Sequence, residues 1–234
     1  MSILDNRFLS SRHARPSLKR GLARQAFGHA ATQGADLPDL FRSLVELRPN
    51  PKALEREARR LARRPGVLRV ARRPSGLTVM ARNLREMTNS AQSVELFSES
   101  AIVYTHILAE IRGGSLRFGI WRTSFCLHAV ERLVERSAIP LDRAVLPALD
   151  TEFIAIARNA SADRIIREDD ERFVQGVETG LWAGGLDDSA PEPDWPFEDA
   201  KVPIFSARTF LGPNEMRPTV WLRWQDAEHL RMGD

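Results

Sequence analysis

Three patterns in the sequence predict an α+β fold built from two parts. Apolar residues at helical spacing fill much of the first 64 residues. Short runs rich in β-branched residues, bounded by turn residues, come next and recur later in the chain. The small, uncharged stretch 87–93 then separates a basic region from an acidic one. We therefore expect an N-terminal arm over 1–16, a module of helices and a hairpin over 17–86, and an acidic α+β domain with a small antiparallel sheet over 94–234.

The charge is divided unevenly along the chain. Residues 1–85 contain 19 Arg and Lys against 6 Asp and Glu, whereas the remainder contains 15 against 25. Only Lys19, Lys52 and Lys201 are lysines, so nearly all the positive charge is arginine. Such asymmetry is typical of chains whose basic part binds a polyanion, and guanidinium groups match both phosphates and guanine edges. The basic third is therefore predicted to bind nucleic acid.

Three helices are predicted in the basic region. The first covers residues 17–33 and stops at Gly34, and the second opens around 36–38 with a broad apolar stripe. Asn50 is placed to cap the third, which begins with Pro51 and continues to residue 64. The buried stripe of that third helix is Leu54, Ala58 and Leu61. Its remaining surface holds five arginines: Arg56, Arg59, Arg60, Arg63 and Arg64.

A β-hairpin is predicted directly after the third helix. The runs 67–71 and 77–81 are of β type, and between them Arg72 and Arg73 precede a Pro-Ser-Gly turn. Three helices followed by a hairpin with a basic tip resemble the winged helix-turn-helix family. That resemblance implies a third helix in the major groove of duplex DNA and a wing against its backbone. The candidate nucleic-acid-binding residues are then Arg56, Arg59, Arg60, Arg63, Arg64, Arg72 and Arg73.

The acidic domain is predicted to combine hairpins with helices. Residues 94–111 and 116–121 form strands around the turn at 112–115, and a helix capped by Thr123 or Ser124 ends near Arg136. Further strands are expected at 205–210 and 219–224. The acidic run 167–171 is interpreted as a solvated helix face. The acidic, proline-containing stretch 187–199 is interpreted as a surface loop, or as a competitor of DNA for the basic helix.

The helix around residues 128–136 supplies an alternative, catalytic interpretation. His128, Arg132 and Arg136 lie on one stripe of this helix. Together with the Ile-Pro-Leu-Asp segment and the helix that follow, it resembles small RNase toxin domains of the barnase and RelE type over about 25 residues. The resemblance implies metal-independent RNA cleavage, in which His128 transfers a proton while Arg132 and Arg208 stabilise the phosphate and Ser206 assists. A solvated, salt-bridged helix face is the other interpretation.

Other motifs are absent from the sequence. It has no phosphate-binding Gly-rich loop, no His-Glu-x-x-His and no paired cysteines, so no cofactor or metal is predicted. No apolar stretch approaches the roughly 20 residues that span a bilayer, so no membrane partner is predicted. The single cysteine, Cys126, agrees with a reducing compartment, and cytoplasmic location is expected.

Three functions remain open from the sequence. The first is a DNA-binding protein, such as a regulator of a bacterial or mobile-element operon, whose acidic domain serves sensing, dimerisation or partner binding. The second is a toxin-like RNA endonuclease. The third is a non-enzymatic assembly protein whose oppositely charged halves mediate self-association.

Overall fold

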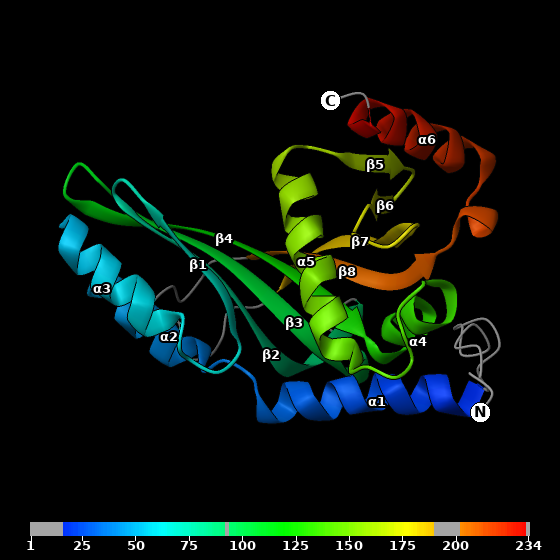
Figure 1. Ribbon diagram of the computed structural model, residues 1–234, viewed down its shortest axis with the longest axis horizontal. Coiled ribbons are helices and arrows are strands. Elements are labelled where there is room, and N and C mark those ends of the chain that lie inside the picture. The colour runs from blue at the N-terminus through cyan, green and yellow to red at the C-terminus, as the bar shows by residue number, and fades with distance from the viewer. Residues whose placement is uncertain (1–15, 92–93, 190–201, 233–234) are drawn as a thin grey trace, which may run out of the picture. The chain divides into compact units, whose positions relative to one another are not determined.

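The computed structural model describes residues 16–91, 94–189 and 202–232 (Figure 1). Helices and an extended sheet are both present, which confirms the predicted α+β class. The helices are α1 (Pro16–Thr32), α2 (Leu37–Val45), α3 (Pro51–Leu61), α4 (Leu127–Arg136), α5 (Val145–Ser161), a 3₁₀ turn (Pro213–Glu215) and α6 (Pro218–Met232). The strands are β1 (Val67–Arg73), β2 (Gly76–Ala91), β3 (Val94–Arg112), β4 (Ser115–Cys126), β5 (Ile165–Glu168), β6 (Glu171–Val174), β7 (Leu181–Ser189) and β8 (Val202–Leu211).

The chain divides into two compact units. The arginine-rich unit comprises Phe27–Phe125 and Asp187–Phe205, and the flanking unit comprises Met1–Ala26, Cys126–Leu186 and Ser206–Asp234. Hydrogen bonding orders the strands as β1-β2-β3-β4-β8-β7-β6-β5. This eight-stranded sheet is larger than the small antiparallel sheet that the sequence predicts.

Local capping chemistry starts the helices of the arginine-rich unit where the sequence predicts. The Asp36 carboxylate accepts a hydrogen bond from the backbone N–H of Asp39 at 2.9 Å, at the start of α2. The Asn50 side chain accepts from the N–H of Lys52 at 2.9 Å, and Pro51 occupies the first turn of α3. Each cap satisfies backbone donors that the helix itself leaves free. α1, α2, α3 and the β1–β2 hairpin follow one another in the predicted order, but most of α1 (residues 16–26) belongs to the flanking unit, so a winged-helix module stays a prediction.

The hairpin of β1 and β2 is not an isolated wing. β2 pairs with β1 on one side and, from Gly76 to Ala91, with β3 on the other. Residues 87–91, which the sequence suggests as a linker, continue β2 opposite residues 94–99 of β3. The expected domain boundary at 87–93 therefore falls inside the arginine-rich unit. Small polar residues complete a strand here because a neighbouring strand supplies the hydrogen-bond partners.

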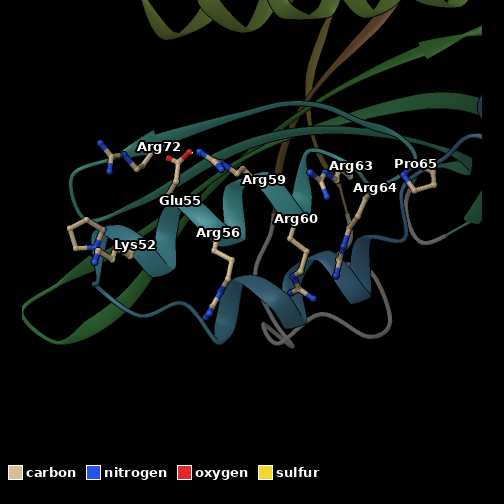
Figure 2. Close-up of a pocket in the computed structure, with 10 residues that line it drawn as sticks. Lys52, Glu55, Arg56, Arg59, Arg60, Arg63, Arg64, Pro65 and Arg72 are labelled. Atoms are coloured by element: carbon tan, nitrogen blue, oxygen red, sulfur yellow. Dashed lines mark hydrogen bonds and ion pairs between the residues drawn. The ribbon is translucent and has the colours of Figure 1, made fainter.

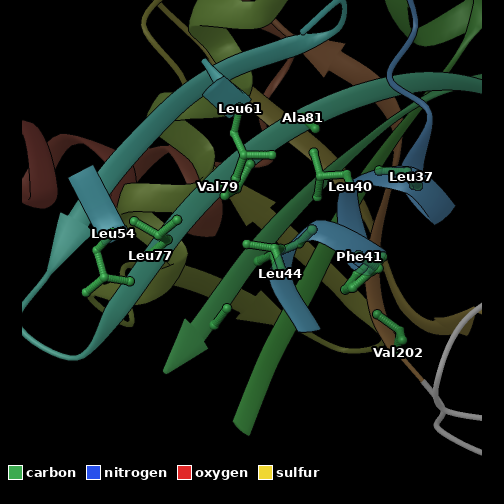
Figure 3. Packing of buried hydrophobic residues seen from close by; sticks show 12 residues of the cluster. Leu37, Leu40, Phe41, Leu44, Leu54, Leu61, Leu77, Val79, Ala81 and Val202 are labelled. Carbon is green, nitrogen blue, oxygen red and sulfur yellow. The ribbon is translucent and has the colours of Figure 1, made fainter. Parts of the chain in front are cut away.

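The core of the arginine-rich unit lies between the sheet and two helices (Figure 3). α2 contributes Leu40, Phe41 and Leu44, and α3 contributes Leu54 and Leu61, all at most 1% exposed. The facing sheet residues are Leu77, Val79 and Ala81 of β2 with Ile107 and Ala109 of β3. Because α3 buries its leucine stripe against the sheet, its charged positions face solvent.

His106 of β3 lies on the opposite face of the sheet from this core, since it is paired with Met80 and neighbours Ile107 along the strand. Its Nε2 is buried and has no hydrogen-bond partner among the described residues. Burial, and after it the charge of Arg73, lowers the pKa of His106 below its ordinary value of 6.5. The sheet therefore holds the neutral imidazole more readily than the imidazolium.

A pH-dependent stability follows from His106. Because its pKa is lower in the folded chain than in the unfolded chain, its contribution is fully present above pH 6.5 and is lost as pH falls below that value. We expect His106→Leu to reduce the loss of unfolding free energy between pH 7.5 and 5.5, measured by urea unfolding at each pH. His128→Leu, at an exposed histidine, is the matched control. Equal pH dependence of wild type and His106→Leu would contradict this account.

Three local predictions for the second half of the chain are wrong. Residues 219–224 belong to α6 and not to a strand, and Val220 and Trp224 are buried one helical turn apart. The acidic run 167–171 forms the β5–β6 hairpin and not a helix, with Asp169 at φ 51° in its turn. Thr123 and Ser124 are buried within β4, so α4 begins only at Leu127. In each case, pairing or packing with distant residues overrides the local signal.

Two predicted segments lie wholly or mostly outside the described residues. Of the predicted N-terminal arm, residues 1–16, only Pro16 is among the described residues. The acidic stretch 187–199 overlaps them only at the end of β7. In the part of the chain that is described, no helix is long and apolar enough to cross a membrane.

Candidate nucleic-acid interface

A basic groove runs along α3 beside the tip of β1 (Figure 2). It has a volume of about 1120 Å³. Its lining consists of Pro51, Lys52, Glu55, Arg56, Arg59, Arg60, Arg63, Arg64, Pro65 and Arg72. Six of the seven arginines that the sequence singles out thus meet at one surface, and we call this surface the arginine groove.

The helix arranges these side chains in two rows. Residues four apart share a face of a helix, so Glu55 and Arg59 form one row. α3 ends at Leu61, three residues before the predicted end, so Arg63 follows in the turn after the helix. Lys52, Arg56 and Arg60 form the other, which extends roughly 12 Å along the helix axis at 1.5 Å per residue, and Arg64 follows the end of the helix. Figure 2 shows Arg59 and Arg63 on the side of α3 that faces Arg72, and Arg56 and Arg60 on the opposite side.

The two arginines at the hairpin tip have different positions. Arg72 is paired with Leu77, whose side chain packs in the core beneath α3, so Arg72 lies on the helix-covered face of the sheet. Arg73 points to the other face, where its Nε donates to the Thr78 hydroxyl at 3.2 Å. Only Arg72 therefore lines the arginine groove.

Acidic neighbours hold three of the arginines in the groove. Arg59 Nε donates to Glu55 Oε1 at 2.9 Å. Arg60 binds both carboxylate oxygens of Glu57, and this hydrogen bond raises the pKa of Arg60. Arg64 pairs with Asp39 of α2 at 2.8 Å and also donates to the Ser43 hydroxyl.

Four cations in the groove have no such neighbour in the part of the chain that the structure describes. Within residues 16–91, 94–189 and 202–232, no carboxylate forms an ion pair with Lys52, Arg56, Arg63 or Arg72. All four are exposed. Unpaired, exposed guanidinium and ammonium groups around one groove attract a multiply charged anion and offer it bidentate hydrogen bonds.

The alternative catalytic residues are brought together only in part. On α4, Arg132 Nε lies 3.4 Å from Nε2 of the exposed His128, and Arg132 also pairs with Glu135. Arg136 donates to the Thr209 hydroxyl of β8 at 3.3 Å and pairs with Glu215 at 2.6 Å. Arg136 is not among the predicted site residues, although it lies on the same stripe of α4 as His128 and Arg132.

Ser206 and Arg208 do not join this cluster. Side chains alternate along a strand, and Thr209 is the β8 residue whose side chain reaches α4. Ser206 and Arg208 therefore lie on the opposite face of β8 from Thr209, and Arg208 is exposed. The four residues of the ribonuclease interpretation thus form no single site.

A buried carboxylate in the flanking unit was not anticipated. Glu152 of α5 is 1% exposed and accepts hydrogen bonds from Trp182 Nε1 at 2.7 Å, Glu178 N at 2.8 Å and Val177 N at 3.0 Å. Burial raises the pKa of Glu152, while the three donors act in the opposite direction. Its position between Leu149 and Phe153, on the apolar stripe of α5, is the sequence signal that marks it.

Neither metal-binding clusters nor relatives add to this site. The described residues contain no group of three His, Cys, Asp or Glu side chains that could hold a metal ion. Comparisons with protein-family models, curated proteins and solved structures give no match.

Proposed function

We propose that the arginine-rich unit binds duplex DNA through the arginine groove. The observation that supports this most directly is the set of four exposed cations, Lys52, Arg56, Arg63 and Arg72, that surround one groove and pair with no carboxylate of the described residues. α3 contains 11 residues and is therefore roughly 16 Å long. A major groove about 12 Å wide admits an α-helix. A helix of this length can present side chains to the bases while its neighbours bind phosphates.

The winged-helix resemblance assigns to DNA the six arginines of this groove and also Arg73, which lies on the other face of the sheet. It would make α3 the recognition helix, and the hairpin tip with Arg72 would contact the DNA backbone. Leu54 and Leu61 fix α3 on the sheet, so binding requires no refolding of the helix. A regulator of an operon, with the flanking unit sensing a signal or binding a partner, is the biological role that we propose for such a protein.

A salt titration tests the proposed function. Four phosphate contacts predict that log K for a random-sequence duplex falls against log salt with a slope of about −3.6, because each neutralised phosphate releases about 0.9 counterions. The measurement is fluorescence anisotropy with a labelled 20-base-pair duplex between 50 and 300 mM NaCl, repeated with single-stranded DNA and an RNA duplex. Affinity that does not change with salt would contradict the proposal, as would tighter binding to RNA at every salt concentration.

A further inference from the structure

Glu55 is a carboxylate within the otherwise basic charged lining of the arginine groove. Its side chain is 46% exposed. A phosphate placed beside it would be repelled, so Glu55 weakens the binding of any DNA backbone at that point. A surface that bound only phosphate would gain affinity from a neutral residue here.

Glu55 also fixes the direction of an arginine. Its Oε1 accepts from Arg59 Nε at 2.9 Å, while the Arg59 side chain remains 74% exposed. An arginine has five N–H donors, so this bond leaves the two terminal nitrogens free. Fixing the side chain in advance removes part of the entropy cost of a later bidentate contact.

Repulsion and orientation together select the partner of Arg59. The carboxylate disfavours a phosphate at the free end of the guanidinium, but it does not disfavour the uncharged acceptors of a base. Guanine presents O6 and N7 side by side in the major groove, and this pair matches the arginine fork. Arg60 differs, because both oxygens of Glu57 already bind it and less of its fork remains free.

We infer that the Glu55–Arg59 pair reads guanine, whereas the unpaired cations of the arginine groove bind phosphate. This inference rests on the proposed DNA binding and adds its sequence specificity: sites that contain a guanine opposite the middle of α3 are preferred. Arg59 would contact the base, and Glu55 would be a positioning residue that acts through Arg59. A simpler account makes the pair an i,i+4 ion pair that supports only the helix, and the experiment below separates the two.

The test begins with selection of bound sequences from a duplex library with a randomised central region, using the full chain. The affinity ratio between the selected duplex and one with that guanine replaced is then measured for each variant. We expect Glu55→Ala to lower this ratio about tenfold, the order of one bidentate base contact, and to raise affinity for a scrambled duplex. Arg59→Lys, which keeps the charge but loses the fork, should lower the ratio similarly and retain the scrambled-duplex affinity.

Glu46→Ala is the matched control. Glu46 is exposed at the end of α2 and forms no ion pair among the described residues, so the variant changes the charge equally without releasing Arg59. Its guanine preference should equal that of the wild type. A preference that survives Glu55→Ala or Arg59→Lys, or duplex binding without any guanine preference, would overturn this inference and leave the proposed function standing. Failure to bind any duplex would overturn both.

Discussion

Replacing Arg56, Arg63 and Arg72 together by glutamine is expected to weaken binding to duplex DNA by roughly 10²- to 10³-fold near 0.1 M salt. Each of these side chains is exposed in the arginine groove and has no carboxylate partner among the described residues, so each is available to a phosphate. The loss of three phosphate contacts makes the slope of log K against log salt less steep by about 2.7. The expected loss of affinity follows from the counterions that are then no longer released. Fluorescence anisotropy across a salt series measures the affinity and the slope together.

Three arginines of the flanking unit provide the control for net charge. Arg143, Arg158 and Arg208 are exposed and form no ion pair in the described part of the chain. Their joint replacement by glutamine changes the net charge by the same amount but leaves the arginine groove intact. We expect at most a small loss of affinity and an unchanged slope. Equal losses in the two triple variants would mean that overall charge attracts DNA and that the groove has no special part.

The elements that the sequence predicts correctly are those that short-range chemistry determines. Asp36 and Asn50 mark the starts of α2 and α3 because a capping side chain acts within three residues of itself. The turn at 74–75 is equally local, since Arg73 and Gly76 close the hairpin. Gly76 is also required for a reason that no local pattern reveals. A Cβ there would lie 1.9 Å from the carbonyl oxygen of Ala109 on β3, so a side chain would clash with the neighbouring strand.

The errors arise where distant segments decide the structure. Residues 87–91 are too polar to suggest a strand, yet β3 provides them with partners. Residues 219–224 alternate like a strand, yet Val220 and Trp224 pack one helical turn apart against the cluster that contains Phe173. Pairing and packing between residues far apart in the sequence therefore set the limit of what pattern analysis could predict.

The candidate site is likewise predictable only where local sequence determines it. The arginine pattern on α3 predicts a basic helix face, and the side chains do meet in one groove. Which arginines are neutralised depends in part on tertiary contacts, such as that of Arg64 with Asp39 of α2. The separation of Arg72 from Arg73 follows only once the register of β1 against β2 is known.

Replacing Glu152 by alanine is expected to destabilise the flanking unit by roughly 3–5 kcal/mol. The variant would leave the buried Trp182 Nε1–H and the part-buried backbone N–H groups of Val177 and Glu178 without their acceptor, and each unsatisfied buried group costs about 1–3 kcal/mol. Removing the carboxylate offsets part of this cost, because burying its charge is itself unfavourable, as the raised pKa of Glu152 indicates. Urea unfolding followed by circular dichroism measures the loss.

Two further variants and a control separate the hydrogen bonds of Glu152 from its mere size. Glu152→Gln preserves the volume and one acceptor but turns an amide N–H₂ toward one set of donors, so we expect a smaller loss than for alanine. Gly176→Ala should also destabilise, because a Cβ at that position would lie 1.6 Å from Glu152 Oε2 and push the carboxylate from its donors. Gly21→Ala in α1, where a Cβ meets nothing within 4 Å, should be neutral or slightly stabilising. If glutamine at position 152 preserved full stability, size and not the charged acceptor would explain the buried residue.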